Sequence, residues 1–284
     1  MDRNQEIIRS RQNRHVVELC KLLDRKAREA SRKFRFDGIK LCEEALQNGV
    51  EIEQLFLKES RADAILAHLQ SKFGSDALAN IPRVLFLEDG LFDKISEEKS
   101  PEGVICCAKY IDKFQKNITI YNSADFSQFE NEKIVLLESV RDPSNIGAII
   151  RSAAALGIDR LILSADCADV YHPRAVRASM GTLFNQPITR VDDLAEAVKM
   201  LRKSGRRVLA AALTENAVCL GSFAIQKGDC IVIGNEGHGL SREVIETCDR
   251  KVFIPMSDKV ESFNAAVAAS ILMWEFFGKP RAGK

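Results

Sequence analysis

The chain has 284 residues, of which 46% are hydrophobic and 29% charged, and its formal net charge is +1. This composition is typical of a folded globular protein with one large or two modest domains, and it excludes disordered and fibrous chains. The charge is unevenly distributed, because the first 35 residues are rich in arginine and lysine. The N-terminal part is therefore a candidate nucleic-acid contact, although the whole chain is not basic.

The first residues lack the apolar core of a secretory signal, and no run reaches the roughly 18 apolar residues of a membrane span. The eight cysteines form no C-x-x-C pair and have no histidine at zinc spacing. We therefore expect a soluble cytoplasmic protein with reduced thiols, no metal and no membrane partner.

The N-terminal part predicts a small α/β unit over residues 1–115. Apolar and basic positions alternate over residues 6–30 and predict one helix, followed by a polar, basic stretch at 31–38. A second helix is predicted to end at Gly49, which can adopt the left-handed conformation of a helix C-terminus. Strands and helices then alternate to residue 110. The polar residues 116–131 are predicted to be a linker.

The C-terminal part, residues 132–284, predicts a parallel sheet. Six apolar segments alternate with five helical ones, and segments such as IVLL and CIVI are apolar on both faces. Strands of that kind belong in a parallel sheet that helices cover on both sides. The predicted strands lie at 133–140, 160–166, 188–191, 206–213, 229–237 and 251–256, and the predicted helices at 146–157, 172–184, 194–205, 241–248 and 263–277.

Ligands of parallel sheets bind where strands lead into loops, and the loop 140–147 carries the first candidate residues. Asn145 could cap the helix that follows or contact a ligand. Arg151 is the lone charge of an apolar helix and lies almost two turns further, so we expect it to face roughly the same side. It is either a member of a buried ion pair or a ligand for phosphate.

Two later loops carry the remaining candidates. The segment IVIGNEGHGLS has glycines at 234, 237 and 239 that let a ligand approach the backbone, with Glu236 among them. It matches neither the dinucleotide fingerprint nor the P-loop. Where the last helix begins, Ser262 is a candidate N-cap and Asn264 follows it.

Basic side chains on helices and near the N-terminus are candidate RNA contacts. Arg174 and Arg177 lie three residues apart on a predicted helix. This spacing fits either a solvent-exposed basic face or the binding of RNA phosphates. The other predicted RNA contacts come from the basic N-terminal stretch and are Arg25, Arg32, Lys33 and Arg35.

Three ordered motifs carry a resemblance to the SpoU/TrmH branch of the SPOUT methyltransferases. They are NIGAIIR, IVIGNEGHGLS and IPMSDKVESFNAAVAASILMWE, and VRASMGTLF between them is also similar. The segments RKFRFDGIKLCEEAL and SPEGV resemble the small RNA-binding domain, akin to a ribosomal-protein fold, that many of these enzymes carry. The resemblance implies a trefoil-knotted catalytic domain, a homodimer, and methylation of a ribose 2′-hydroxyl in RNA with S-adenosyl-L-methionine (AdoMet).

The resemblance also implies site residues. Cofactor contacts fall on Gly234, Ile254, Phe263, Leu213 and Met256, and Phe263 stands where the family usually has leucine. The catalytic set falls on Arg151, Asn145, Glu236, Ser262 and Asn264. The family proposal makes Arg151 the base, but a guanidinium with a pKa of about 12 or more suits phosphate binding and alkoxide stabilisation better.

Several alternatives remain open. The appended N-terminal domain favours ribosomal RNA, of the 23S type, over tRNA as the substrate, and DNA is not expected. A non-catalytic RNA-binding or ribosome-assembly protein could share the fold. An unrelated nucleotide-binding enzyme could use the 234–239 loop, and tight ATP or NAD binding without AdoMet binding would identify it.

Overall fold

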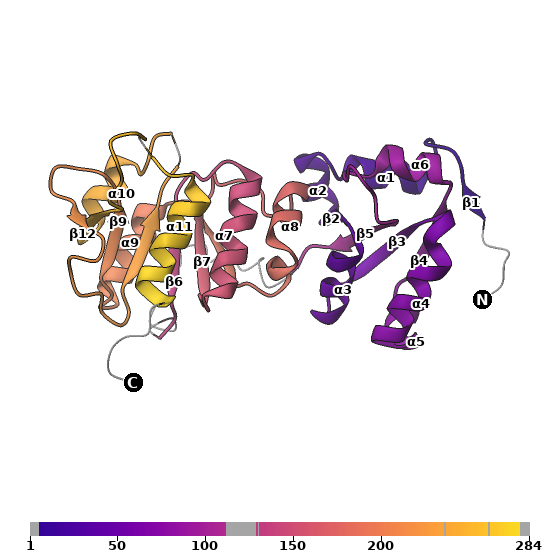
Figure 1. Cartoon of the computed structure of the whole chain (residues 1–284), viewed down its shortest axis with the longest axis horizontal. Helices are drawn as coiled ribbons and strands as arrows, with labels where there is room; N and C mark the ends of the chain where they lie inside the picture. The colour runs from indigo at the N-terminus through magenta and orange to yellow at the C-terminus, as the bar shows by residue number, and fades with distance from the viewer. Residues whose placement is uncertain (1–5, 112–128, 130, 236, 261, 279–284) are drawn as a thin grey trace. The chain divides into compact units, whose positions relative to one another are not determined.

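The computed structural model describes residues 6–111, 129, 131–235, 237–260 and 262–278. The chain forms two compact units (Figure 1). The first comprises residues 1–111 together with 169–185, and the second comprises residues 112–168 and 186–284. The sequence-based boundaries at 115 and 132 stay a prediction, and most of the predicted linker lies outside the described residues.

The first unit contains a five-stranded mixed sheet in the order β1-β4-β3-β5-β2. Its strands are β1 (Ile7–Ile8), β2 (Lys33–Asp37), β3 (Ile52–Lys58), β4 (Arg83–Leu87) and β5 (Val104–Lys109). Its helices are α1 (Arg14–Lys21), α2 (Arg25–Ser31), α3 (Ile39–Gln47), α4 (Ala62–Phe73), α5 (Ser75–Ala79), α6 (Asp89–Ile95) and α8 (Pro173–Ser179), with short 3-10 turns at Glu59–Arg61 and Thr182–Phe184.

The prediction of one helix over residues 6–30 is wrong. The side chain of Asn13 accepts a hydrogen bond from His15 N and caps α1, and Asp24 caps α2 by accepting from Ala27 N. Short polar side chains at N-caps satisfy backbone N–H groups that a continuous helix would bond internally. Two short helices therefore replace the predicted long one.

The polar stretch at 31–38 contains β2, which pairs antiparallel with β5. Its residues alternate between the two faces of the sheet. Phe34 and Phe36 are buried on one face, while Arg35 and Asp37 form a buried ion pair on the other (2.9 Å). Since the two charges neutralise each other, a segment that reads as polar can be a buried strand.

Residues 169–185 pack within the first unit although they follow a strand of the second. The segment contains α8 and the turn Thr182–Phe184, separated by Met180 and Gly181 in the left-handed conformation. The predicted continuous helix at 172–184 therefore breaks at Met180. The ring of Phe184 lies 5.3 Å from that of Phe36, so this segment completes the aromatic core of the unit.

The second unit contains a seven-stranded sheet in the order β10-β12-β9-β11-β6-β7-β8, and every pairing in it is parallel. Its strands are β6 (Ile134–Leu137), β7 (Arg160–Ser164), β8 (Ile188–Val191), β9 (Val208–Ala211), β10 (Val218–Cys219), β11 (Cys230–Ile233) and β12 (Arg250–Phe253). Its helices are α7 (Pro143–Ala155), α9 (Leu194–Lys203), α10 (Arg242–Thr247) and α11 (Ala265–Met273), followed by a π-helical turn at Trp274–Gly278.

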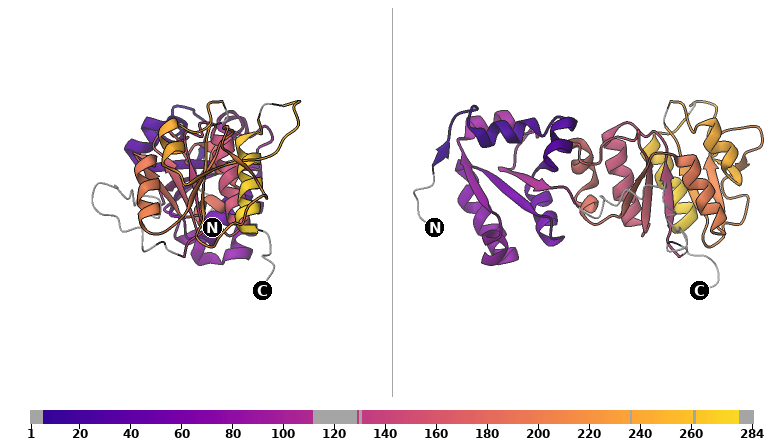
Figure 2. Two further views of the ribbon diagram at one scale, coloured as in Figure 1. Left: turned by 90° about the vertical axis from the view of Figure 1, so that its left-hand side faces the viewer. Right: turned by 180° about the vertical axis from the view of Figure 1, so that it is seen from behind.

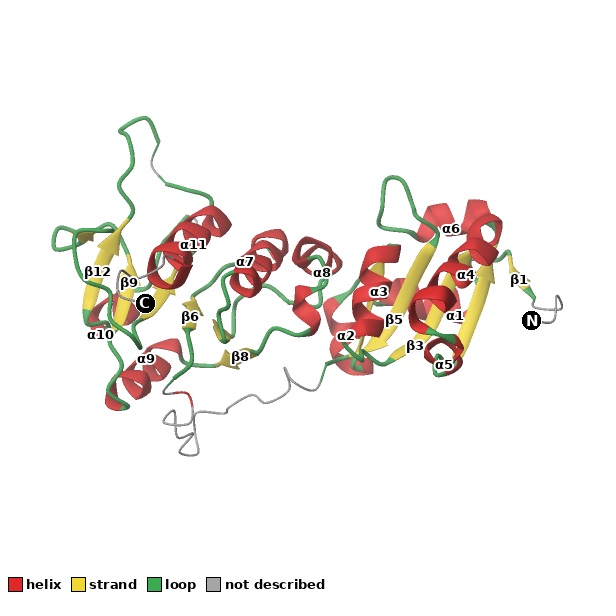
Figure 3. Cartoon of the chain, turned by 60° about the horizontal axis from the view of Figure 1, so that its bottom comes forward, coloured by secondary structure: helices red, strands yellow, loops and turns green. Residues whose placement is uncertain are grey.

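Helices cover both faces of this sheet (Figures 2 and 3). One set of strand side chains, including Leu136 and Val232, packs on Leu194, Val198 and Val244 of α9 and α10. The alternate side chains are also buried and point to the opposite face, where α7 packs beside α11. The prediction of an α/β fold with a parallel sheet and a second, smaller α/β unit is confirmed, while the knot stays a prediction. No helix among the described residues is long and apolar enough to span a membrane.

Candidate functional site

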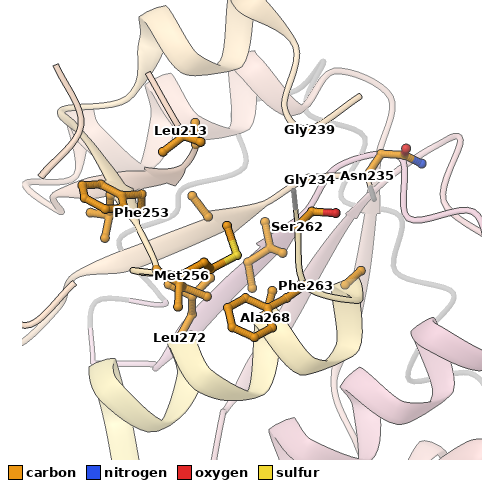
Figure 4. A pocket seen from close by; sticks show the side chains of 16 residues that line it. Leu213, Gly234, Asn235, Gly239, Phe253, Met256, Ser262, Phe263, Ala268 and Leu272 are labelled. Carbon is orange, nitrogen blue, oxygen red and sulfur yellow. The ribbon is translucent and has the colours of Figure 1, made fainter. Parts of the chain in front are cut away.

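A cavity of about 250 Å³ opens at the carboxyl ends of β9, β11 and β12 (Figure 4). Three strand-to-loop segments and the start of α11 form its walls. The lining residues are Ala211, Ala212, Leu213, Ile233, Gly234, Asn235, Gly239, Val252, Phe253, Ile254, Met256, Ser262, Phe263, Ala265, Ala268 and Leu272. Most of these side chains are apolar, so the cavity suits a ligand with a flat apolar part.

All five residues predicted to contact the cofactor line this cavity, although about 50 residues of sequence separate the first from the last. Leu213 follows β9, Gly234 follows β11, and Ile254 and Met256 follow β12. Phe263 closes the cavity from the segment before α11. Their contact with a cofactor stays a prediction, but the parallel register places the ends of their strands together.

Gly234 lies where the backbone of the loop folds back on itself. Asn235 N donates to Gly239 O (3.1 Å), and Gly239 N donates to Asn235 O (3.0 Å). A Cβ at position 234 would lie only 2.5 Å from Gly239 O and 2.6 Å from Leu240 N. Only glycine fits at this position, and its backbone forms part of the cavity wall.

Asn235 also lines the cavity, and the sequence-based reasoning missed it. Its side-chain oxygen accepts hydrogen bonds from Gly237 N (2.8 Å) and His238 N (3.2 Å). Its side-chain nitrogen donates to Ser139 O (2.8 Å) after β6. Asn235 therefore ties the glycine-rich loop to the neighbouring strand. An asparagine two residues after the end of a buried strand, with glycines on both sides of it, was the available signal.

Asn145 and Asn264 come from different motifs and meet in the structure. Asn264 Nδ2 donates to Asn145 Oδ1 (3.0 Å), and Ser270 Oγ donates to Ser152 Oγ (2.9 Å) further along the same two helices. The hydrogen bond places the amides of two predicted catalytic residues at the N-terminal ends of α7 and α11. This pair supplies polar amide groups, whereas the cavity lining is mostly apolar.

Neither Asn145 nor Ser262 caps a helix, which excludes the capping alternative that the sequence left open for each. Asp142 caps α7 by accepting from Ser144 N (2.6 Å), so Asn145 lies inside the first turn. Asn264 caps α11 by accepting from Ala266 N and Val267 N, so Ser262 is exposed on the rim instead. With the capping role filled by Asp142, the side chain of Asn145 is available to Asn264.

Arg151 is exposed on α7, which excludes the buried ion pair considered from the sequence. Six helical residues correspond to about 240° of rotation, so Arg151 does not face the side of Asn145 as we expected. Glu236, the remaining predicted catalytic residue, lies outside the described residues.

The six predicted RNA contacts all lie in the first unit, but their environments differ. Arg35 is fully buried and donates to Asp37 and to Ile95 O, so it has no surface for RNA, and its prediction is wrong. Arg25 pairs with Glu29, and Lys33 pairs with Glu53. Arg32, Arg174 and Arg177 are exposed.

No group of three or more metal-ligating side chains occurs among the residues that the structure describes. Burial raises the pKa of several thiols, to about 12 for Cys107 and Cys248 and to about 11 for Cys230. These cysteines are protonated at neutral pH and act as small apolar core residues.

The chain matches two family models. Residues 132–274 match the SpoU rRNA Methylase family, and residues 13–106 match the MRM3-like substrate binding domain. A curated relative in Bacillus subtilis, the 23S rRNA (guanosine(2553)-2′-O)-methyltransferase RlmP, is 27% identical over 95% of this chain and 99% of its own length.

Solved structures agree with these matches. An AdoMet-bound rRNA methyltransferase from Sinorhizobium meliloti is 26% identical, covers 95% of this chain and 96% of its own, and has a TM-score of 0.77. The SpoU methyltransferase AviRb from Streptomyces viridochromogenes, in complex with AdoMet, is 27% identical, covers 96% and 100%, and also has a TM-score of 0.77. Two family models and full-length structural similarity agree: this chain belongs to the SpoU rRNA methylase family.

Proposed function

We propose that this protein methylates a ribose 2′-hydroxyl of ribosomal RNA in the cytoplasm, with AdoMet as the methyl donor. The observation that carries the proposal is the convergence of two site components in the second unit. One is the cavity that all five predicted cofactor residues line, and the other is the Asn145–Asn264 pair. The hydrogen bond between Asn145 and Asn264 joins two motifs across 119 residues of sequence.

The cavity fits AdoMet in its chemistry. Apolar side chains such as Ile254, Phe263 and Leu272 offer a surface for the adenine ring, and the loop backbones offer hydrogen-bonding groups for its edge. The absence of a side chain at Gly234 lets a ligand approach the backbone there. AdoMet supplies an electrophilic methyl group on a sulfonium.

Polar side chains would bind and orient the ribose of the substrate. The attacking hydroxyl is weakly acidic and must lose its proton, and negative charge grows on its oxygen as it does so. The exposed guanidinium of Arg151, which faces another side of α7, would hold a phosphate of the RNA substrate. Asn145 and Asn264 would orient the ribose as a linked pair, with Ser262 and Glu236 supporting them.

The choice of ribosomal RNA rests on the first unit and on the relatives. A substrate-binding domain matches residues 13–106, and the Bacillus subtilis relative is named for methylation of 23S rRNA. Exposed cations of this unit, Arg32, Arg174 and Arg177, would supply phosphate contacts. Such contacts weaken as salt increases.

We also propose that the protein acts as a homodimer. Val267 of α11 and Trp274, where the π-helical turn begins, are 47% and 50% exposed and lie seven residues apart, about two helical turns. Large apolar side chains that share an exposed helix face are typical of an interface. A second copy of the chain would cover them.

The test is methylation of total RNA from a host that lacks the modification, with tritiated AdoMet, followed by mapping of 2′-O-methyl positions. Arg151→Ala is compared with Arg242→Ala, which removes an exposed arginine of the same unit whose side chain pairs with Glu246 on its own helix. We expect label at one ribosomal nucleotide, lost in the first variant and kept in the second. Label in tRNA would overturn the substrate, and AdoMet binding without label on any RNA would favour a non-catalytic protein.

A further inference from the structure

Three side chains form a stack at the end of β5 in the first unit. The rings of Tyr110 and Tyr171 are parallel to within 12°, with centroids 3.9 Å apart. The guanidinium carbon of Arg32 lies 4.6 Å from the centroid of the Tyr110 ring. A ring face covered at 3.9 Å has no room for a second group, so Arg32 lies on the opposite face of Tyr110 from Tyr171.

The stack is held in place from both sides. Tyr171 is 5% exposed, and its hydroxyl accepts a hydrogen bond from Ile111 N (2.8 Å). Tyr110 N donates to Arg32 O (2.9 Å), which links the backbones of the other two residues. The tyrosine pair is therefore a rigid support for the guanidinium.

Arg32 occupies an unusual backbone position. It ends α2 with φ of 56°, in the left-handed region that favours glycine or asparagine at helix C-termini. The left-handed backbone does not favour arginine, so we infer that the role of this position lies in the side chain of Arg32. That side chain is exposed, and among the described residues no hydrogen bond or ion pair engages its guanidinium.

The neighbouring cations differ from Arg32. Arg25 donates to Glu29 (2.7 Å), and Lys33 pairs with Glu53 (2.5 Å). The Arg32 guanidinium lies over the ring of Tyr110, and the Arg32 side chain is exposed to solvent. A guanidinium in this state can stack on a nucleobase and donate hydrogen bonds to the adjoining phosphate.

We propose that the Arg32–Tyr110–Tyr171 stack binds one unpaired nucleotide of the RNA substrate, with the base on the outer face of the guanidinium. The inference rests on the proposed function, because it takes RNA as the substrate. It adds a requirement for single-stranded RNA at this point. A base inside a duplex is covered by its neighbours and has no free face to offer.

The experiment compares Arg32→Lys with Arg83→Lys in the full chain. Both variants keep the positive charge and remove a planar guanidinium, and Arg83 is an exposed arginine of the same unit at the start of β4. The probes are a short single-stranded RNA that contains 2-aminopurine and a duplex of the same length. The fluorescence of 2-aminopurine changes when the base leaves its neighbours in the strand for another stacking partner, so the readout does not depend on methyl transfer.

We expect the unsubstituted protein and Arg83→Lys to change the 2-aminopurine fluorescence of the single strand equally. Arg32→Lys should lose this fluorescence change and bind the single strand roughly tenfold more weakly, with an unchanged salt dependence and unchanged duplex affinity. An equal fluorescence change with both variants would overturn the proposal, and so would an equal loss of affinity for single strand and duplex. Failure of the proposed function would differ, because the unsubstituted protein would then transfer no methyl group to RNA.

Discussion

Substitution of Gly234 by alanine tests whether the cavity binds AdoMet through the glycine-rich loop. The new Cβ would lie 2.5 Å from Gly239 O and 2.6 Å from Leu240 N, whereas non-bonded atoms prefer about 3.5 Å. The backbone would have to move by about 1 Å, which breaks the paired hydrogen bonds between Asn235 and Gly239. Overpacking of this kind costs about 1–3 kcal/mol.

In the free protein the 234–239 loop can relieve this clash by opening. The overpacking energy therefore weakens AdoMet binding, because the bound ligand requires the closed loop. A cost of about 1–3 kcal/mol corresponds to a roughly 5- to 150-fold increase in the Kd for AdoMet. Isothermal titration calorimetry measures this Kd directly, and thermal unfolding in the absence of ligand shows whether the fold survives.

Gly237→Ala is the matched control, since the substitution is the same and the site is in the same loop. A Cβ at 237 meets nothing closer than Asn235 Oδ1 at 3.5 Å, which is ordinary contact. We expect AdoMet affinity within about twofold of the unsubstituted protein. Unchanged affinity in Gly234→Ala, or equal losses in both variants, would refute the assignment of this loop to the cofactor.

Three further predictions concern single residues. Asn235→Ala should raise the Kd for AdoMet with little change in thermal stability, because it frees the loop from β6; an unchanged Kd would exclude this positioning role. Phe184→Ala should destabilise the first unit by about 3–5 kcal/mol in urea unfolding, since this buried ring completes the aromatic core. Hydrogen bonds from Lys72 and His68 lower the pKa of Glu43, so its ionised form stabilises the fold. Glu43→Gln should therefore lower the free energy of unfolding at pH 7, and the difference should fade below about pH 4 as Glu43 is protonated. A pH-independent difference would contradict this reasoning.

The sequence by itself determined the fold class and the residues that gather at the cavity. Strands such as Cys230–Ile233 are apolar on both faces, and only a parallel sheet between two helical layers buries both. The motif residues from Leu213 to Phe263 were assigned from the resemblance to the SpoU/TrmH methyltransferases, and the structure gathers them because their strands end at one edge of that sheet. The loop sequence also marked Gly234 as a point where a ligand can approach the backbone, whereas the lack of room for a Cβ there is a finding of the structure.

Only the tertiary structure decided features that depend on distant partners. The basic stretch at 31–38 became the strand β2 because Asp37 neutralises Arg35 in a buried pair, which no local pattern reveals. Residues 169–185 joined the first unit because Tyr171 and Phe184 bury their rings against Phe34 and Phe36. The pairing of Asn145 with Asn264 likewise required α7 and α11 to lie side by side, because a hydrogen bond between residues 119 positions apart is set by packing and not by sequence spacing.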